Sequence, residues 1–224
     1  MNIIGHHEAA RQYSGRENPA YLFGSMVSDF VGMFRLPKRY RSVELPEGPL
    51  RDGMDLHQPT NTVFDGLEVI RSLNRAMAES FKRFMPIWPA NQAAAVGRDI
   101  LFDGYFMDKP DVIDSYSRTM DAAISGEIDF GNITEPIETF KERLVRFVQM
   151  GPPNYNDPYE VAYRLQRRLV GTKSSFDESL VEDVSESMAE YLPHVQEIGA
   201  EVVQLVVSGL SSRPDLASKL TDKG

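Results

Sequence analysis

The fold is decided by residues 18–34, which read NPAYLFGSMVSDFVGMF. Asn18 and Pro19 are typical of a helix start, because asparagine caps the first turn and proline needs no hydrogen-bond donor there. Apolar side chains then recur at helical spacing and form one stripe: Leu22, Met26, Phe30 and Met33. The stretch therefore predicts an amphipathic helix, with Asp29 beside its apolar stripe.

The same helical pattern continues along most of the chain. It predicts further helices over 65–84, 91–107, 111–125, 134–150, 158–170 and 177–207. Residues 46–48 open another helical stretch, which Pro59 is expected to kink or end. No window alternates apolar and polar residues long enough to require a sheet. The sequence predicts an all-α, single-domain helical bundle over residues 1–210, with a polar tail over 211–224 and the break at 151–153 read as a loop.

Composition narrows the classes of protein to consider. The chain has 224 residues, a net charge of -9 and no cysteine. The missing cysteines exclude a disulfide scaffold, a thiolate zinc site, an iron–sulfur cluster and a cysteine nucleophile. The acidic balance argues against general nucleic-acid binding. No stretch approaches the roughly 18 apolar residues of a membrane span, and no secretory leader is recognised, so a cytoplasmic location is expected.

Few residues can carry chemistry, and five of them fall on four separate predicted helical segments: His6, Asp29, His57, Asp99 and Asp103. A single histidine is more often a packed or surface residue than a ligand. A carboxylate among apolar neighbours, however, is costly to bury unless it is paired or bound to metal. Asp99 and Asp103 share one helix face, where either Arg98 or a divalent metal would offset their repulsion.

Four short blocks, in this order, carry a resemblance to a known family. They are NIIGH (2–6), GSMVSDF (24–30), GMDLH (53–57) with Asp65 eight residues on, and DILFD (99–103). The chain resembles the acyl carrier protein phosphodiesterases, a divergent all-helical branch of the HD-type metal-dependent phosphohydrolases. The resemblance covers the first half of the chain well and the second half loosely, and it implies an HD-domain-like fold.

The resemblance also implies an activity, namely hydrolysis of the phosphodiester that links 4′-phosphopantetheine to a serine of acyl carrier protein. A divalent metal, Mn or Mg with Fe or Zn as alternatives, would activate the attacking water. The implied ligands are His6, Asp29, His57 and Asp99, and the implied catalytic residues are Asp29 and Asp103. Asp65 would orient His57, or else cap the next helix.

Departures from the family pattern keep other functions open. Asn61 stands where the family has an aspartate, Phe64 replaces a threonine, and Gly104 stands where the family tends to have histidine. Asn61 still offers an oxygen near the metal but no charge. These changes favour a non-catalytic helical binding module as the alternative. A di-iron oxygenase is the third and least favoured hypothesis, because the chain has only four histidines.

Two basic clusters and the methionines each allow two interpretations. The first cluster follows the Asp29 helix and comprises Arg35, Lys38, Arg39 and Arg41. The second comprises Arg164, Arg167 and Arg168. Each is either a solvated surface or a site for phosphate or an acidic partner such as acyl carrier protein. The methionine stripes (Met26, Met33, Met54 and Met77) predict core, with an acyl or pantetheine groove as the alternative. The oligomeric state is left open.

Overall fold

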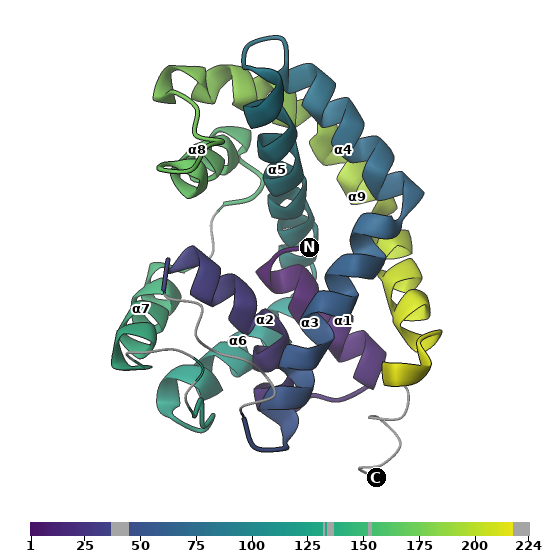
Figure 1. Ribbon diagram of the computed structural model, residues 1–224, viewed down its shortest axis with the longest axis vertical. Coiled ribbons are helices and arrows are strands. Elements are labelled where there is room, and N and C mark those ends of the chain that lie inside the picture. Colours follow the sequence, from purple (N-terminus) through teal and green to yellow (C-terminus); the bar gives the residue numbers. More distant parts are fainter. Residues whose placement is uncertain (37–44, 132, 134–136, 152–153, 217–224) are drawn as a thin grey trace.

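The computed structural model describes residues 1–36, 45–131, 133, 137–151 and 154–216, and every regular element in these ranges is a helix (Figure 1). The all-helical prediction is therefore confirmed. The helices, in chain order, are α1 (Ile3–Ser14), α2 (Pro19–Met33), α3 (Pro49–Gly66), α4 (Glu68–Phe81), α5 (Ile87–Met107), α6 (Pro110–Ser125), α7 (Ile137–Met150), α8 (Pro158–Leu169), the short 3₁₀ helix η2 (Glu178–Leu180) and α9 (Val181–Ser211).

Helix starts follow the local signals in the sequence. The Asn18 side chain accepts a hydrogen bond from the backbone N–H of Tyr21 at 3.1 Å, and Pro19 opens α2. Asp157 caps α8 in the same way through the N–H of Tyr159, at 3.0 Å. These side chains satisfy backbone donors that have no partner within the first turn of a helix.

Pro59 does not end its helix, so that part of the prediction is wrong. The helix α3 runs on to Gly66 with Pro59 in its interior. An interior proline costs a helix about 3 kcal/mol. The buried residues on both sides of it, His57 in the preceding turn and Phe64 beyond it, offset that cost through tertiary packing.

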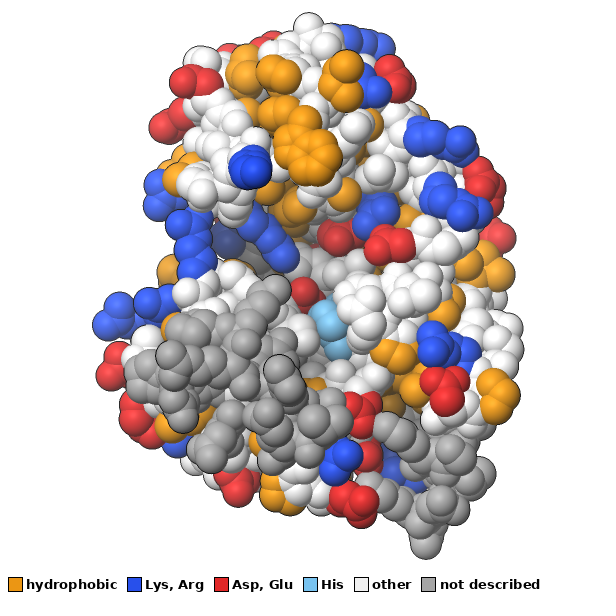
Figure 2. All heavy atoms as spheres, viewed as in Figure 1, with side chains coloured by type: hydrophobic (Ala, Val, Ile, Leu, Met, Phe, Trp, Pro, Cys, Tyr) orange, Lys and Arg blue, Asp and Glu red, His pale blue; other side chains and the backbone are white. Residues whose placement is uncertain are grey.

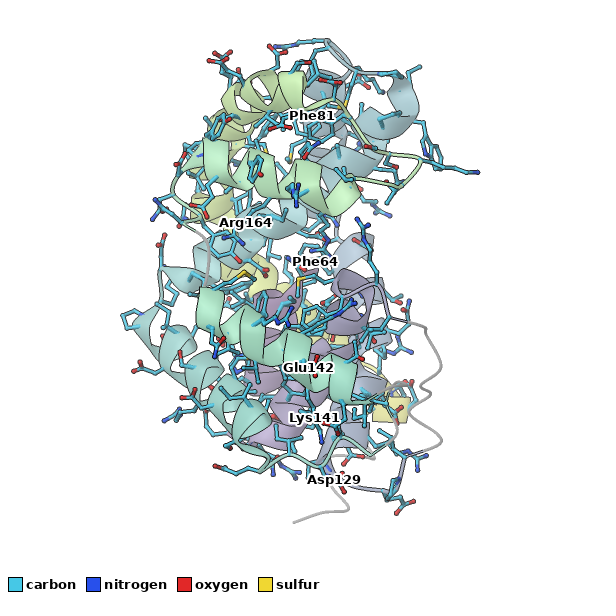
Figure 3. All side chains as sticks on the ribbon, turned by 90° about the vertical axis from the view of Figure 1, so that its left-hand side faces the viewer. Phe64, Phe81, Asp129, Lys141, Glu142 and Arg164 are labelled. Carbon is cyan, nitrogen blue, oxygen red and sulfur yellow. The ribbon has the colours of Figure 1, made fainter. Side chains whose placement is uncertain are left out.

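The helices form two groups joined by the longest elements (Figure 1). We call the group of α4, α8 and the adjoining parts of α5 and α9 the upper lobe, and the group of α1, α2, α3, α6 and α7 the lower lobe. The 31-residue α9 runs through both lobes. In the side view, Phe81 lies within the upper lobe and Arg164 lies where the two lobes meet (Figure 3).

The helices α2 and α3 cross in close contact in the lower lobe. A Cβ atom added at Gly24 would overlap the backbone oxygen of Leu50, and one added at Gly53 would overlap the backbone oxygen of Tyr21. Only glycine allows the two backbones to approach in this way. The close crossing brings the backbone of Ser25 next to α3.

Three of the four methionines that predict core are buried: Met26, Met54 and Met77. The fourth, Met33, is half-buried and lines a cavity described below. The polar tail expected over 211–224 begins where α9 ends, at Ser211, and its residues 217–224 lie outside the described part of the chain. Among the described residues, no helix is both long enough and apolar enough to span a bilayer.

Candidate metal centre

Three of the predicted ligands meet in the lower lobe. His6 from α1, Asp29 from α2 and His57 from α3 each offer a ligand atom, and these atoms all lie within 4.8 Å of one another. The two imidazole rings are stacked, with centroids 3.9 Å apart. Histidine side chains are visible in a hollow between the lobes, with acidic and basic side chains around it (Figure 2).

The His57 ring is oriented by a backbone carbonyl. Its Nδ1 atom lies 2.7 Å from the carbonyl oxygen of Ser25, which can only accept, so Nδ1 carries the proton and donates it. In the neutral ring the lone pair is then on Nε2, the nitrogen that can bind a metal.

Asp65 does not have the predicted role. Its carboxylate pairs with Arg98 at 3.0 Å, and its side chain is 58% exposed. It is also not a helix cap, because α4 has Leu67 at that position. The carbonyl of Ser25 does the work that the sequence assigned to Asp65. A backbone carbonyl leaves no residue-type signal, so sequence reasoning could not find it.

Asn61 bridges the two imidazoles. Its Oδ1 lies 3.1 Å from Nε2 of His6, and its Nδ2 lies 3.2 Å from Nε2 of His57. The same Oδ1 accepts a hydrogen bond from the Met1 ammonium group at 3.0 Å. The amide thus lies against both imidazole rings of the cluster, but it brings no negative charge.

Asp29 gives the strongest sign of a cation site. Its Oδ2 atom is buried and has no hydrogen-bond partner among the described residues. Burial raises the pKa of this carboxyl, although His57 acts in the opposite direction. Oδ2 lies 3.9 Å from Nε2 of His6, a ring whose pKa burial holds well below its usual value. A buried carboxylate oxygen without a donor is unfavourable, and a divalent cation would satisfy it.

Asp99 does not join this cluster, which corrects the predicted ligand set. Its carboxylate accepts hydrogen bonds from Arg98 at 2.7 and 2.9 Å and lies 3.4 Å from the Met1 ammonium. Burial raises the pKa of the Asp99 carboxyl, but the ammonium and the guanidinium outweigh it and hold that pKa below its usual value. Of the two cations that could offset the negative charge of Asp99, Arg98 and a divalent metal, the structure shows Arg98.

Asp103 holds the start of α1. Its Oδ1 accepts hydrogen bonds from the backbone N–H groups of Ile4 and Gly5, both at 3.1 Å. Burial raises the pKa of this carboxyl to about 8. Asp103 therefore positions the helix that carries His6 and also borders the neighbouring cavity.

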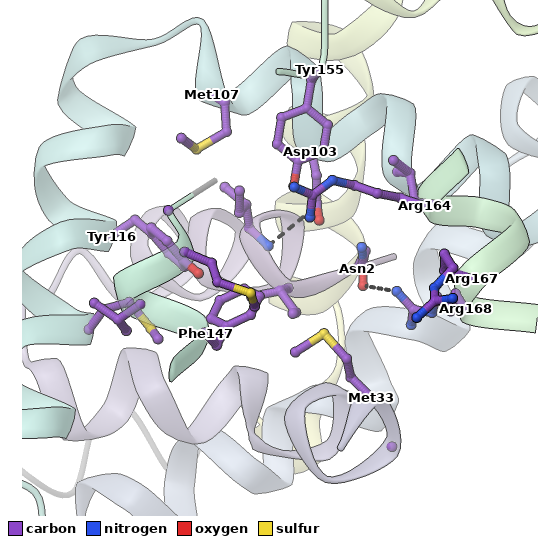
Figure 4. A pocket seen from close by; sticks show the side chains of 18 of the residues that line it. Asn2, Met33, Asp103, Met107, Tyr116, Phe147, Tyr155, Arg164, Arg167 and Arg168 are labelled. Atoms are coloured by element: carbon purple, nitrogen blue, oxygen red, sulfur yellow. Dashed lines mark hydrogen bonds between the residues drawn. The ribbon is translucent and has the colours of Figure 1, made fainter. Parts of the chain in front are cut away.

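A cavity of about 930 Å³ opens beside the cluster (Figure 4). Arg164, Arg167 and Arg168 reach it from α8, while Met107, Tyr116 and Phe147 lie across from them. The second basic cluster thus lines a cavity, whereas the sequence alone allowed either a solvated surface or a binding site. Of the first cluster, Arg35 lines the same cavity, whereas Lys38, Arg39 and Arg41 lie outside the described residues.

Gly104 has a structural explanation that the sequence did not reveal. A Cβ atom added there would lie 2.7 Å from Cβ of Tyr155. The space that a larger side chain would need is filled by this tyrosine, whose ring also lines the cavity.

Comparisons of the chain with protein-family models, with curated proteins and with solved structures found no match.

Proposed function

We propose that this protein is a metal-dependent phosphodiesterase in which His6, Asp29 and His57 hold a divalent cation. The single observation that carries the proposal is the convergence of these three side chains around the unpartnered, buried Oδ2 of Asp29. The order of the four sequence blocks supports an HD-domain-like assignment as part of the same proposal.

The donor set favours some metals over others. Two imidazole nitrogens and one carboxylate suit Mn²⁺, Fe²⁺ and Zn²⁺, whereas Mg²⁺ prefers oxygen ligands throughout. We therefore favour Mn²⁺ over Mg²⁺. Once bound, the ion would lower the pKa of a coordinated water and polarise a phosphoryl oxygen.

The chain's own residues would do the rest. The Ser25 carbonyl accepts a hydrogen bond from Nδ1 of His57, which leaves Nε2 as the nitrogen that would bind a metal. Arg164 and Arg168, on the neighbouring cavity wall, would bind the non-bridging oxygens of a phosphodiester. Asp103 lies on that wall as well and stays the proposed second catalytic residue, as a group that can hold a proton near neutral pH.

The experiment measures metal content and hydrolysis together. The protein is incubated with Mn²⁺, desalted and analysed for bound metal, and hydrolysis of bis(p-nitrophenyl) phosphate is then followed. We expect Asp29→Asn to lose bound Mn²⁺ and to lose activity by roughly 100-fold or more. Asp114→Asn, an exposed aspartate on α6, is the matched control and should keep both. Full activity in Asp29→Asn would overturn the proposed site.

The finer part of the proposal concerns the substrate. Acyl carrier protein is implied by the family resemblance, and it is supported by the arginines of α8, which offer a local positive surface in a chain of net charge -9. Incubation with holo-acyl carrier protein should release free 4′-phosphopantetheine. If the protein hydrolyses bis(p-nitrophenyl) phosphate but does not release 4′-phosphopantetheine, the proposed phosphodiesterase activity stands. Acyl carrier protein is then excluded as its substrate.

A non-catalytic binding module is the second candidate, and the Asn61 bridge favours it. Because Asn61 engages Nε2 of both histidines, the cluster is hydrogen-bonded without any metal. Such a module would retain no stoichiometric Mn²⁺ after desalting and would not hydrolyse either substrate. Stoichiometric metal that is lost in Asp29→Asn would exclude it.

A further inference from the structure

The cavity beside the metal centre has two chemically different sides. Its lining is mostly apolar and rich in methionine, with Met33, Met107, Met120 and Met150 drawn from four helices. Methionine side chains adapt to flexible apolar ligands. The volume of about 930 Å³ is at the upper end of what small-molecule sites occupy in proteins.

The opposite side is cationic. Arg35, Arg164, Arg167 and Arg168 all line the cavity. Only Arg164 forms an ion pair with a described carboxylate, that of Glu160 at 2.9 Å. Arg35 and Arg168 donate instead to neutral oxygens, the carbonyl of Val170 at 2.6 Å and the side chain of Asn2 at 2.9 Å.

Arg167 has the fewest described contacts of these arginines. It is exposed, and it forms no hydrogen bond or ion pair with any residue that the structure describes. The acidic side chains on the lining are Asp103, whose Oδ1 is taken by two backbone N–H groups, and Asp121. In a chain of net charge -9, this positive excess around one cavity attracts anions.

We propose that this cavity binds a single-chain anionic amphiphile, with its hydrocarbon chain against the methionine side and a phosphate head group at the arginines of α8. The proposal goes beyond the hydrolysis proposed above, because holding such a molecule requires no metal. The cavity adjoins the metal centre through α2, where Gly32 and Met33 lie one turn after Asp29.

Binding is measured by isothermal titration in the presence of EDTA, with butyl, hexyl, octyl and decyl phosphate below their micellar concentrations. We expect affinity to rise roughly fourfold for each added methylene until the cavity is filled. Inorganic phosphate and decyltrimethylammonium are the comparison ligands. If inorganic phosphate binds as tightly as decyl phosphate, the cavity does not hold the hydrocarbon chain of the ligand. If decyltrimethylammonium binds as tightly as decyl phosphate, the arginines do not select for an anionic head group. Either result would overturn the proposal.

Two variants test the two sides separately. Arg167→Glu reverses an exposed charge that has no described partner, and it should weaken decyl phosphate binding about tenfold or more. Ile113→Glu places a carboxylate on the apolar side, in the first turn of α6, where a negative charge does not disfavour the helix. It should weaken binding similarly.

The matched control is Arg75→Gln, an exposed arginine on α4 that does not line the cavity. It should bind decyl phosphate like the original protein. Asp29→Asn should also retain binding in EDTA, which separates this proposal from the metal centre. If Arg167→Glu and Ile113→Glu both fold, by circular dichroism, and both bind with unchanged affinity, the site is not this cavity.

Discussion

Among single residues, Asn61 decides how strongly the candidate centre would hold a metal. Its side chain lies against Nε2 of both His6 and His57, but it is neutral. Asn61→Asp would place a carboxylate oxygen at the same point and add a negative charge to the ligand set. We expect Mn²⁺ to bind about tenfold or more tightly to this variant, measured by competition with a fluorescent chelator.

The matched control for Asn61→Asp is Gln58→Glu, which adds the same charge to the exposed side of α3. It should leave the Mn²⁺ affinity nearly unchanged, since exposed charges are screened. Equal gains in the two variants would mean that general charge, rather than ligation, attracts the ion.

Asp103 provides a pH prediction at the same scale. Burial raises the pKa of Asp103 from 3.8 to about 8, so between these values the folded protein holds a proton that the unfolded chain releases. Its contribution to stability is therefore complete below about pH 4 and is lost as the pH rises toward 8. Asp103→Asn keeps a hydrogen-bond acceptor for the backbone N–H groups of Ile4 and Gly5, but its side chain does not ionise. The variant should therefore not lose this stability as the pH rises.

Urea unfolding in EDTA at pH 5 and pH 8 checks the Asp103 prediction. The original protein should lose more stability between the two values than Asp103→Asn does. Asp114→Asn, which changes an exposed carboxylate, should follow the original protein. Parallel losses in all three would contradict the assigned role of Asp103.

How much of the site the sequence could predict depends on the kind of group. His6, Asp29 and His57 were predictable because each stands in one of the short sequence blocks that carry the family resemblance, NIIGH, GSMVSDF and GMDLH. Asp99 was placed wrongly, because the pattern that suggested a metal ligand fits an ion pair with Arg98 equally well. The Ser25 carbonyl was beyond reach, since every residue carries the same backbone.

Among the elements, the crossing of α2 and α3 controls the geometry of the centre. Asp29 and Ser25 come from α2 and His57 from α3, so the distance between these helices sets the distances between their side chains. A Cβ atom at Gly53 would also lie 3.0 Å from the backbone nitrogen of Ser25. Any side chain at Gly53 must therefore push the helices apart.

We expect Gly53→Ala to lower the free energy of unfolding by about 3 kcal/mol, because backbone atoms cannot give way as side chains do. It should also abolish Mn²⁺ binding. Gly66→Ala, at the end of the same helix and with open space around the new methyl group, should be neutral or stabilise by up to about 1 kcal/mol. Urea unfolding compares the two, and a Gly53→Ala variant as stable as Gly66→Ala would contradict the close crossing.

The elements themselves were easier to predict than the site. The stripe of Leu22, Met26 and Phe30 and the cap at Asn18 place α2 within one residue of its observed bounds. At Pro59 the prediction allowed a kink or an end, and the structure excludes only the end. The penalty of an interior proline is local, whereas the burial of Phe64 that offsets it comes from distant parts of the chain.

For the whole molecule, a metal bound by three helices should stabilise the fold. Mn²⁺ at about 100 times its dissociation constant adds about 2.7 kcal/mol to the free energy of unfolding. In a chain of this size the melting temperature should rise by roughly 5–10 °C. Differential scanning fluorimetry measures the shift, and Asp29→Asn should show none. A shift of equal size in the variant would place the bound ion elsewhere.

The hydrogen bond from Arg168 to Asn2 joins residues 166 positions apart and has a consequence for the order of folding. On the ribosome, the helices carrying His6, Asp29 and His57 are synthesised long before α8 exists. Contacts so distant in sequence form late, since the intervening chain must first be ordered. The ligand cluster can thus assemble on a nascent chain, whereas the arginine wall of the cavity closes only after α8 has been synthesised.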